Sequence, residues 1–352
     1  MKNLSFSVII LVMLSGCVSG YKQPVTDAYK NQKRKVHVAS VIAQKELDAR
    51  APLQNSAGVG VQFGLIGALI SAAVDSSVNQ GVIENKETQL APIRNELIDF
   101  EFNDHFHKIA TDTLSKVDWL SVSNLSLLND ESDIELNEGE HYLKIDTSYA
   151  LSTDFTTLQV FSYVTIGEVK KVSYRNGKTV KTEFVPIFKN LYKYSSQSIS
   201  RVIKPQAERD QAKLELENWL TEKLAAAESG VDKRHYKQVY RRKKNEIDKD
   251  YSFAEGNLKT AEKWSVDGAT LLKSHLVESA YEIAKMIVLD ISDTRTLDEL
   301  KKSKTEKEYE KGLQIVSESD DRVIVRDTQT AMAGQLCSIV KGSPGNHCKF
   351  LL

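Results

Sequence analysis

The sequence predicts an α+β fold in which an antiparallel sheet of about four to six strands is covered by long helices. Apolar and polar residues alternate between 141 and 200, as in strands with one buried face, and apolar residues recur at helical spacing over 87–117 and 271–291. A charged helical hairpin at about 205–263 is expected as an insertion, and a small β unit at the C-terminus. With 352 residues, of which 41% are hydrophobic, the chain is globular, and its net charge of −1 implies no general attraction to nucleic acid.

The chain begins with a short apolar segment behind one basic residue, Lys2. The apolar centre covers residues 6–14, and the small residues Ser15 and Gly16 precede Cys17. This is the layout of a secretory signal peptide. An uncleaved anchor helix with a chance cysteine is the alternative, but so short a run is poorly suited to span about 30 Å of hydrocarbon.

The order Leu14-Ser15-Gly16-Cys17 resembles the lipobox of bacterial lipoproteins. The resemblance implies that residues 1–16 are removed and that Cys17 carries the lipid, because a nucleophilic sulfur is what accepts the diacylglyceryl group. In the Gram-negative members of that family, Asp at the second mature position signals retention in the inner membrane. Here Val18 and Ser19 follow, so the resemblance implies a lipid-anchored protein of the outer membrane that faces the periplasm.

Two cysteines remain after Cys17, and a leftover pair in an exported protein is a disulfide candidate. They are Cys337 and Cys348, and the residues 341–346 between them are typical of a turn. Two free thiols, or a metal pair with His347, are the alternatives. A zinc site would need two more ligands nearby in the sequence, and none is present.

Composition divides the rest of the chain into four parts. Residues 17–35 are polar and are expected to form a tether from which the body hangs away from the bilayer. Its basic end is either solvated or in contact with anionic headgroups. Residues 36–292 are predicted to form the α+β domain, 293–315 a charged linker, and 316–352 a small β tail closed by the disulfide.

A glycine-rich helix is predicted over residues 57–77, with small residues at every fourth position: Gly60, Gly64, Ala68, Ala72 and Ser76. On a helix they form one smooth stripe that another helix can approach closely, a pattern that resembles the glycine zippers of some envelope lipoproteins and small membrane proteins. Three interpretations stay open: a helix buried in the domain, a contact with identical subunits or another partner, and insertion into a bilayer. Because glycine in a solvated helix costs about 1 kcal/mol relative to alanine, we expect something to pack against the stripe.

Strands are predicted at 36–42 and 120–125, followed by a meander of about four strands in 141–200. Arg175-Asn176-Gly177-Lys178 has the Asn-Gly pair of a type I′ hairpin turn. Aromatic residues are dense in this region, and they either fill the core or line a groove: Tyr163, Tyr174, Phe184, Phe188, Tyr192 and Tyr194.

The charged hairpin has one narrow apolar stripe on each helix, broken at Ser229-Gly230. The two stripes are Leu216, Trp219, Leu220 and Leu224, then Tyr236, Tyr240, Ile247 and Tyr251. The second helix is strongly basic. It either meets lipid phosphates, lipopolysaccharide or an acidic protein, or is solvated and paired with the acidic first helix. Asp267-Gly268 then precedes the amphipathic helix 271–291.

No pattern of catalytic or metal-binding residues is found. His105 and His107 would point about 200° apart on a helix, and Glu101 with His105 supplies only two ligands. Nucleophile elbow, phosphate-loop and zinc-helix motifs are absent from the sequence. We therefore predict that the protein is not an enzyme and binds no metal or cofactor.

The expected function is that of an interaction or structural component of the cell envelope, self-associating through the stripe from Gly60 to Ser76. A lipid- or glycan-binding module in the aromatic sheet is the first alternative. An envelope hydrolase of unknown type is the second.

Overall fold

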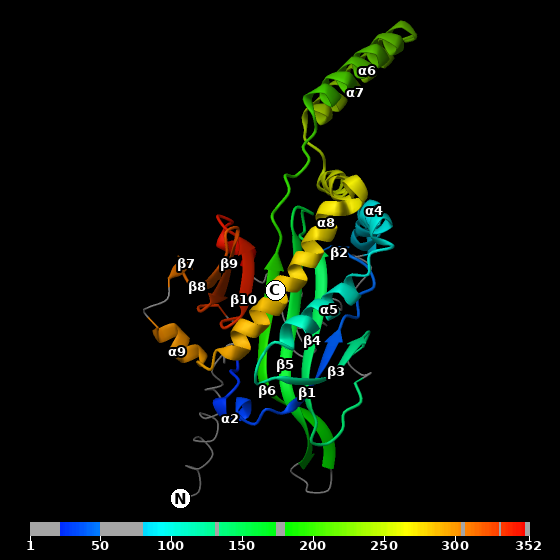
Figure 1. The fold of residues 1–352 in the computed structure, drawn as a ribbon. Helices are drawn as coiled ribbons and strands as arrows, with labels where there is room; N and C mark the ends of the chain where they lie inside the picture. Colours follow the sequence, from blue (N-terminus) through cyan, green and yellow to red (C-terminus); the bar gives the residue numbers. More distant parts are fainter. Residues whose placement is uncertain are drawn as a thin grey trace, which may run out of the picture.

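A ten-stranded mixed sheet organises the protein (Figure 1). The computed structural model describes residues 22–49, 80–130, 134–173, 180–303, 307–330 and 332–348. The strands are β1 (Lys35–Val41), β2 (Asp48–Ala49), β3 (Ser121–Leu128), β4 (His141–Leu151), β5 (Leu158–Ser173), β6 (Val180–Ser195), β7 (Glu308–Glu310), β8 (Leu313–Glu318), β9 (Arg322–Asp327) and β10 (Leu336–Val340). Their order is β3-β1-β4-β5-β6-β10-β9-β8-β7, and the short β2 pairs with β4.

The sheet is larger than expected and not purely antiparallel. Strands β4, β5 and β6 form the predicted antiparallel meander, but β1 is parallel to both β3 and β4, and β10 is parallel to β6. The prediction of mixed helices and strands is confirmed, whereas that of an antiparallel sheet of four to six strands is wrong. Residue alternation identifies a strand but not its partner. The parallel pairs here join strands that are separated by long helical or looped excursions.

Seven helices and one 3₁₀ turn are found in the part of the chain that the structure describes. They are α2 (Asp27–Lys30), α4 (Gln80–Leu97), α5 (Phe102–Leu114), α6 (Gln206–Ala225), α7 (Gly230–Asp248), α8 (Phe253–Ser292), α9 (Leu297–Lys302) and η2 (Gly345–Cys348). Helices α5 and α8 cover one face of the sheet, and α4 packs on α8 (Figure 1). The helical pattern over 87–117 thus falls on two helices.

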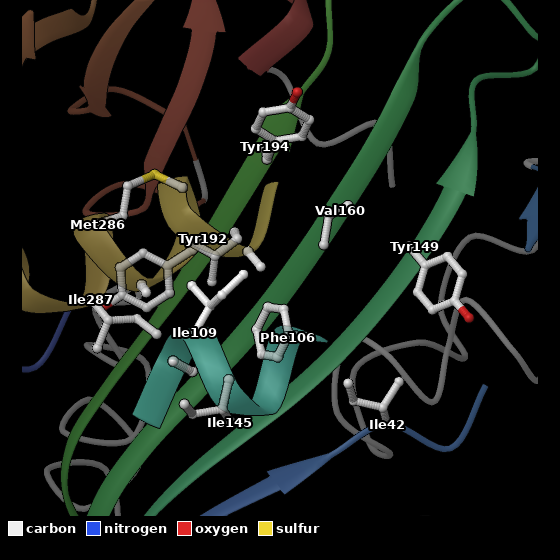
Figure 2. Close-up of a cluster of buried hydrophobic side chains, with 14 of the residues drawn as sticks. Ile42, Phe106, Ile109, Ile145, Tyr149, Val160, Tyr192, Tyr194, Met286 and Ile287 are labelled. Atoms are coloured by element: carbon white, nitrogen blue, oxygen red, sulfur yellow. The ribbon is translucent and has the colours of Figure 1, made fainter. Parts of the chain in front are cut away.

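The main core lies between the sheet and the helices α5 and α8 (Figure 2). Phe106 and Ile109 of α5 and Ile287 of α8 are buried against strand residues that include Tyr192 and Tyr194. Burying an apolar side chain of this size contributes about 1.5–3 kcal/mol. Tyr192 and Tyr194 therefore fill the core and do not line an open groove.

Helix α8 is kinked where the sequence predicts a helix start. Asp267, Gly268 and Ala269 have positive φ angles of 53°, 67° and 57°. The half beyond the kink packs on the sheet. The half before it also belongs to the body, because the Trp264 indole N–H donates to the Phe155 carbonyl at 2.6 Å.

The C-terminal strands continue the main sheet through the pairing of β10 with β6. The predicted bond between Cys337 and Cys348 is confirmed, with an S–S distance of 2.14 Å. It lies in a second small core with Val323, Val325 and Ile339. Within the predicted charged linker, α9 begins with a capping box in which Thr296 and Glu299 each accept from the other's backbone N–H.

Candidate functional site

Most of the predicted functional positions lie outside the described residues. These are Cys17, the hairpin turn at 175–178, and the stripe of Gly60, Gly64, Ala68, Ala72 and Ser76. The disulfide Cys337–Cys348 is the predicted pair that the structure describes. The surfaces that can carry function are therefore sought elsewhere in the fold.

The chain enters the fold at a buried charge cluster close behind Cys17. The Lys22 Nζ lies 3.2 Å from the Asp290 carboxylate and 3.3 Å from that of Asp293, both near the end of α8. Arg326 of β9 also pairs with Asp290, at 2.8 Å. Asn190 and Tyr192 of β6 donate to the same carboxylate at 2.6 and 3.0 Å.

The side chains of Lys22 and Asp290 are fully buried, so each charge depends on its partners. Burial alone would raise the pKa of Asp290, but Arg326, Lys22 and the Asn190 amide outweigh it and hold the pKa below its usual value. Burial lowers the pKa of Lys22 despite the attraction of Asp290. This cluster was not predicted from the sequence. The signal available was an aspartate among Ile283, Ile287 and Ile291 on the apolar side of a helix.

Residues 22–35, which the sequence assigns to a tether, are part of the folded body. Gln23 pairs with Lys189 of β6, and Tyr29 of α2 is buried, with its hydroxyl 3.0 Å from the His141 ring. Only residues 18–21 separate Cys17 from Lys22. An extended chain covers at most about 3.6 Å per residue, so Lys22 lies within about 18 Å of Cys17.

The helices α6 and α7 form an arm that stands out from the body (Figure 1). The predicted apolar stripes face each other. Leu216 is buried, Trp219 packs edge-on against Tyr236 at 6.1 Å, and Lys243 lies 5.2 Å from the centre of the Trp219 ring. The Ser229 hydroxyl caps α7 by accepting from the Asp232 N–H at 3.1 Å.

The basic residues of α7 are exposed. The ion pairs that join the two helices near the base run from α6 cations to acids, with Lys213–Asp248 at 2.6 Å and Arg209–Asp250 at 3.8 Å. Pairing of α7 cations with α6 acids, one of the two alternatives drawn from the sequence, is not found among the ion pairs of the described residues. Lys233, Lys237 and Arg241 are exposed and form no ion pair among the described residues, and the exposed Lys244 lies 5.8 Å from the centre of the Tyr240 ring.

The arm and the chain entry lie at opposite ends of the body. Figure 1 shows α2 near the lower end and the arm projecting from the upper end. Helix α8 connects the two, because it starts shortly after α7 and carries Asp290 near its other end. With 20 residues in α6 and 19 in α7, the arm is about 30 Å long.

The histidines serve structural contacts. Arg34 donates to the Nε2 of His141 at 2.5 Å, which leaves Nδ1 to carry the proton beside the Tyr29 hydroxyl. Burial first, and then Arg34, lower the pKa of His141. On α5, His105 stacks on Phe100 and His107 bonds Ser40, so the pair diverges as expected.

A hollow of about 400 Å³ lies where the ends of α5 and α8 meet. Its lining residues are Thr113, Lys116, Val117, Asp118, Trp119, Val288 and Ser292. The indole N–H of Trp119 is buried there and has no acceptor among the described residues. The Trp119 ring lines this hollow beside an exposed lysine and an exposed aspartate.

Within the described ranges, no group of three or more metal-ligating side chains is assembled, and none of the helices is long and apolar enough to cross a membrane. Comparisons with protein-family models, curated proteins and solved structures found no match.

Proposed function

We propose that the protein is a lipid-anchored component of the cell envelope that makes its contacts through the α6–α7 arm. Cys17 is the lipidation site, and Val18 and Ser19 directly after it imply, by the lipoprotein resemblance, a location in the outer membrane facing the periplasm. The observation that carries the proposal is the arm itself. It is an exposed two-helix projection at the end of the body remote from Lys22, and its exposed cations on α7 include several that form no ion pair among the described residues.

Supporting evidence comes from the short link behind Cys17 and from the disulfide. An anchor that holds the body close to a bilayer leaves the opposite end as the part that reaches other molecules. Disulfides persist in oxidising compartments such as the periplasm, which agrees with export.

The anchor is tested by producing the full chain in a Gram-negative host and measuring the mass of its N-terminal peptide. A diacylated or triacylated Cys17 peptide is expected, together with membrane association that is lost in Cys17→Ser. An unmodified N-terminus that starts at Met1 refutes the anchor.

The contact role of the arm is tested by placing a photo-cross-linking residue at Arg241 in the anchored chain. The matched control carries it at Lys171 in β5, an exposed cation on the body. Cross-linked protein is expected for the arm position alone. Equal yields from both positions argue against an arm-specific contact.

The hollow at Trp119 supports a second candidate, a binding module for a small polar ligand such as a glycan. The hollow with the Trp119 ring in its wall is the observation in its favour. Native mass spectrometry of the chain purified from membranes is expected to show a bound molecule that is lost in Trp119→Ala, which removes the ring from the wall of the hollow. A mass equal to that of the bare lipidated chain rules the module out.

A further inference from the structure

The arm carries two columns of opposite charge on different sides. On α7, the cations Lys237, Arg241 and Lys244 each directly follow a residue that faces α6, namely Tyr236, Tyr240 and Lys243. On α6, the acids recur at every seventh position: Glu208, Glu215 and Glu222. We call these the basic column and the acidic column.

The columns cannot neutralise each other within one arm. Glu208 and Glu215 directly precede the inner-face residues Arg209 and Leu216, whereas the cations follow theirs. Each residue of a helix is rotated by about 100° from the one before it. In two antiparallel helices, a residue just before an inner-face position on one helix and a residue just after an inner-face position on the other therefore lie on opposite sides of the pair. Lys237 and Glu222 accordingly form no ion pair among the described residues and are exposed.

The charges of the two columns match in height along the arm. Trp219 contacts both Tyr236 and Lys243, which sets the level of α6 against α7. Counting from this level, Glu222 lies level with Lys237 and Glu215 with Lys244. Both spacings are seven residues, about 10.5 Å, so the two pairs can form together between parallel arms.

We propose that arms of neighbouring copies dock side by side, with the basic column of one against the acidic column of the next. The pairs are Lys237 with Glu222 and Lys244 with Glu215. Because the two surfaces differ, the contact is head-to-tail and builds a row or a ring. This inference rests on the proposed anchoring, which points all arms the same way and raises their effective concentration.

Other occupants fit the surface less well. The anchoring membrane lies at the far end of the body. Binding a bilayer also needs a continuous exposed apolar face. The large apolar side chains exposed on the arm are Leu214 of α6 and Val231 at the start of α7, which stand on different helices and form no such face. The complementary charges and the matched spacing are found on the chain itself, which favours a second copy over an unrelated acidic protein.

The test uses two cysteine variants that leave both proposed pairs intact. Arg241→Cys lies in the basic column and Asn218→Cys lies at the same level in the acidic column. The lipidated chains are mixed in phosphatidylcholine vesicles and treated with a short bis-maleimide. Cross-linked dimer is expected from the mixture and not from either variant alone. Equal yields from one variant alone overturn the head-to-tail contact.

Charge reversal provides the decisive control. Lys237→Glu with Lys244→Glu is expected to lower the cross-linked yield about five-fold or more, as is roughly 0.5 M salt. Adding Glu215→Lys and Glu222→Lys restores the pairs with reversed signs, so the yield should recover. The proposal is overturned if charge reversal on α7 leaves the cross-linked yield unchanged, or if the yield does not recover in the variant with all four changes. It is also overturned if cross-linking requires anionic lipid or another protein.

A tagged chain that starts at Val18, held on nickel-lipid vesicles, separates the two proposals. Two results are combined: cross-linking of this shortened chain, and the mass of the Cys17 peptide from the full chain. If the shortened chain cross-links while Cys17 of the full chain is unmodified, arm docking is supported and the lipid anchor is refuted. If the shortened chain does not cross-link while Cys17 of the full chain is lipidated, arm docking is refuted and the lipid anchor stands.

Discussion

Replacing Asp290 with Asn is expected to destabilise the protein more than any other single change of one carboxylate to its amide. The carboxylate is fully buried, accepts from Asn190 and Tyr192, and balances Arg326 and Lys22. Asparagine has nearly the same shape, so Asp290→Asn removes the charge without opening a cavity. Two buried cations are then left with Asp293 as their remaining acid.

The magnitude follows from the cost of breaking a buried ion pair, about 3–5 kcal/mol when one partner is removed. That is a large share of the roughly 5–15 kcal/mol by which a typical domain is stable. Asp293→Asn should cost less, about 1.5–3 kcal/mol, because its carboxylate is 14% exposed and also pairs with Arg295 at the surface. Asp298→Asn on α9 lacks these contacts and should stay within about 0.5 kcal/mol.

Urea denaturation of the chain beginning at Val18, followed by tryptophan fluorescence, measures these differences. The pH dependence provides a second check. Because the folded pKa of Asp290 is lowered, its contribution is present above the unfolded pKa of about 3.9 and is lost as pH falls through the folded value. The difference in the free energy of unfolding between wild type and Asp290→Asn should therefore become smaller below about pH 4. A loss of less than about 1 kcal/mol at pH 7 would refute the reasoning.

Three further changes test other parts of the fold. Gly268→Ala puts a side chain at a φ of +67° and should lower the free energy of unfolding in urea by about 1–2 kcal/mol. The control, Gly230→Ala at the start of α7, should leave it unchanged, because a Cβ there meets nothing within 4 Å. Equal effects of the two changes would argue against strain at the kink. The double change Cys337→Ser and Cys348→Ser should lower the free energy of unfolding by about 2–3 kcal/mol relative to the oxidised wild type. Reductant should lower the stability of the wild type by a similar amount, and a wild type whose stability does not change with reductant would contradict a stabilising disulfide. Because the folded pKa of His141 is lowered, its protonation costs stability as pH falls below about 6.5. His141→Gln should flatten the denaturation profile from pH 7 to 5, and an unchanged slope contradicts that role.

Local features of the chain could be predicted from the sequence because they depend on near neighbours. The inner stripe of α6, the helix break at Asp267-Gly268 and the Cys337–Cys348 bond all follow from spacing and residue type. Each needs only the geometry of one helix, one turn or one short loop. The aromatic residues of β6 illustrate the limit, since alternation cannot tell a strand face covered by α8 from an open one.

The long-range features could not be predicted. The parallel pairing of β10 with β6 depends on where a distant strand finds a free edge, and nothing in residues 336–340 specifies that edge. The cluster around Asp290 is similar. An aspartate on an apolar helix face indicates a buried charge, but the sequence does not reveal that Lys22 and Arg326 are the cations that pair with it.

The Lys22 cluster changes what the basic arm can do. A long flexible tether would let α7 fold back onto the lipid headgroups beside Cys17. With residues 18–21 as the whole link, Lys22 stays within about 18 Å of Cys17, and α8 carries the arm from the opposite end. In the proposed anchoring, the cations of α7 at the remote end of the body face the surfaces of other molecules. For anchored copies that share one orientation, the first such surface is the acidic column of the neighbouring arm.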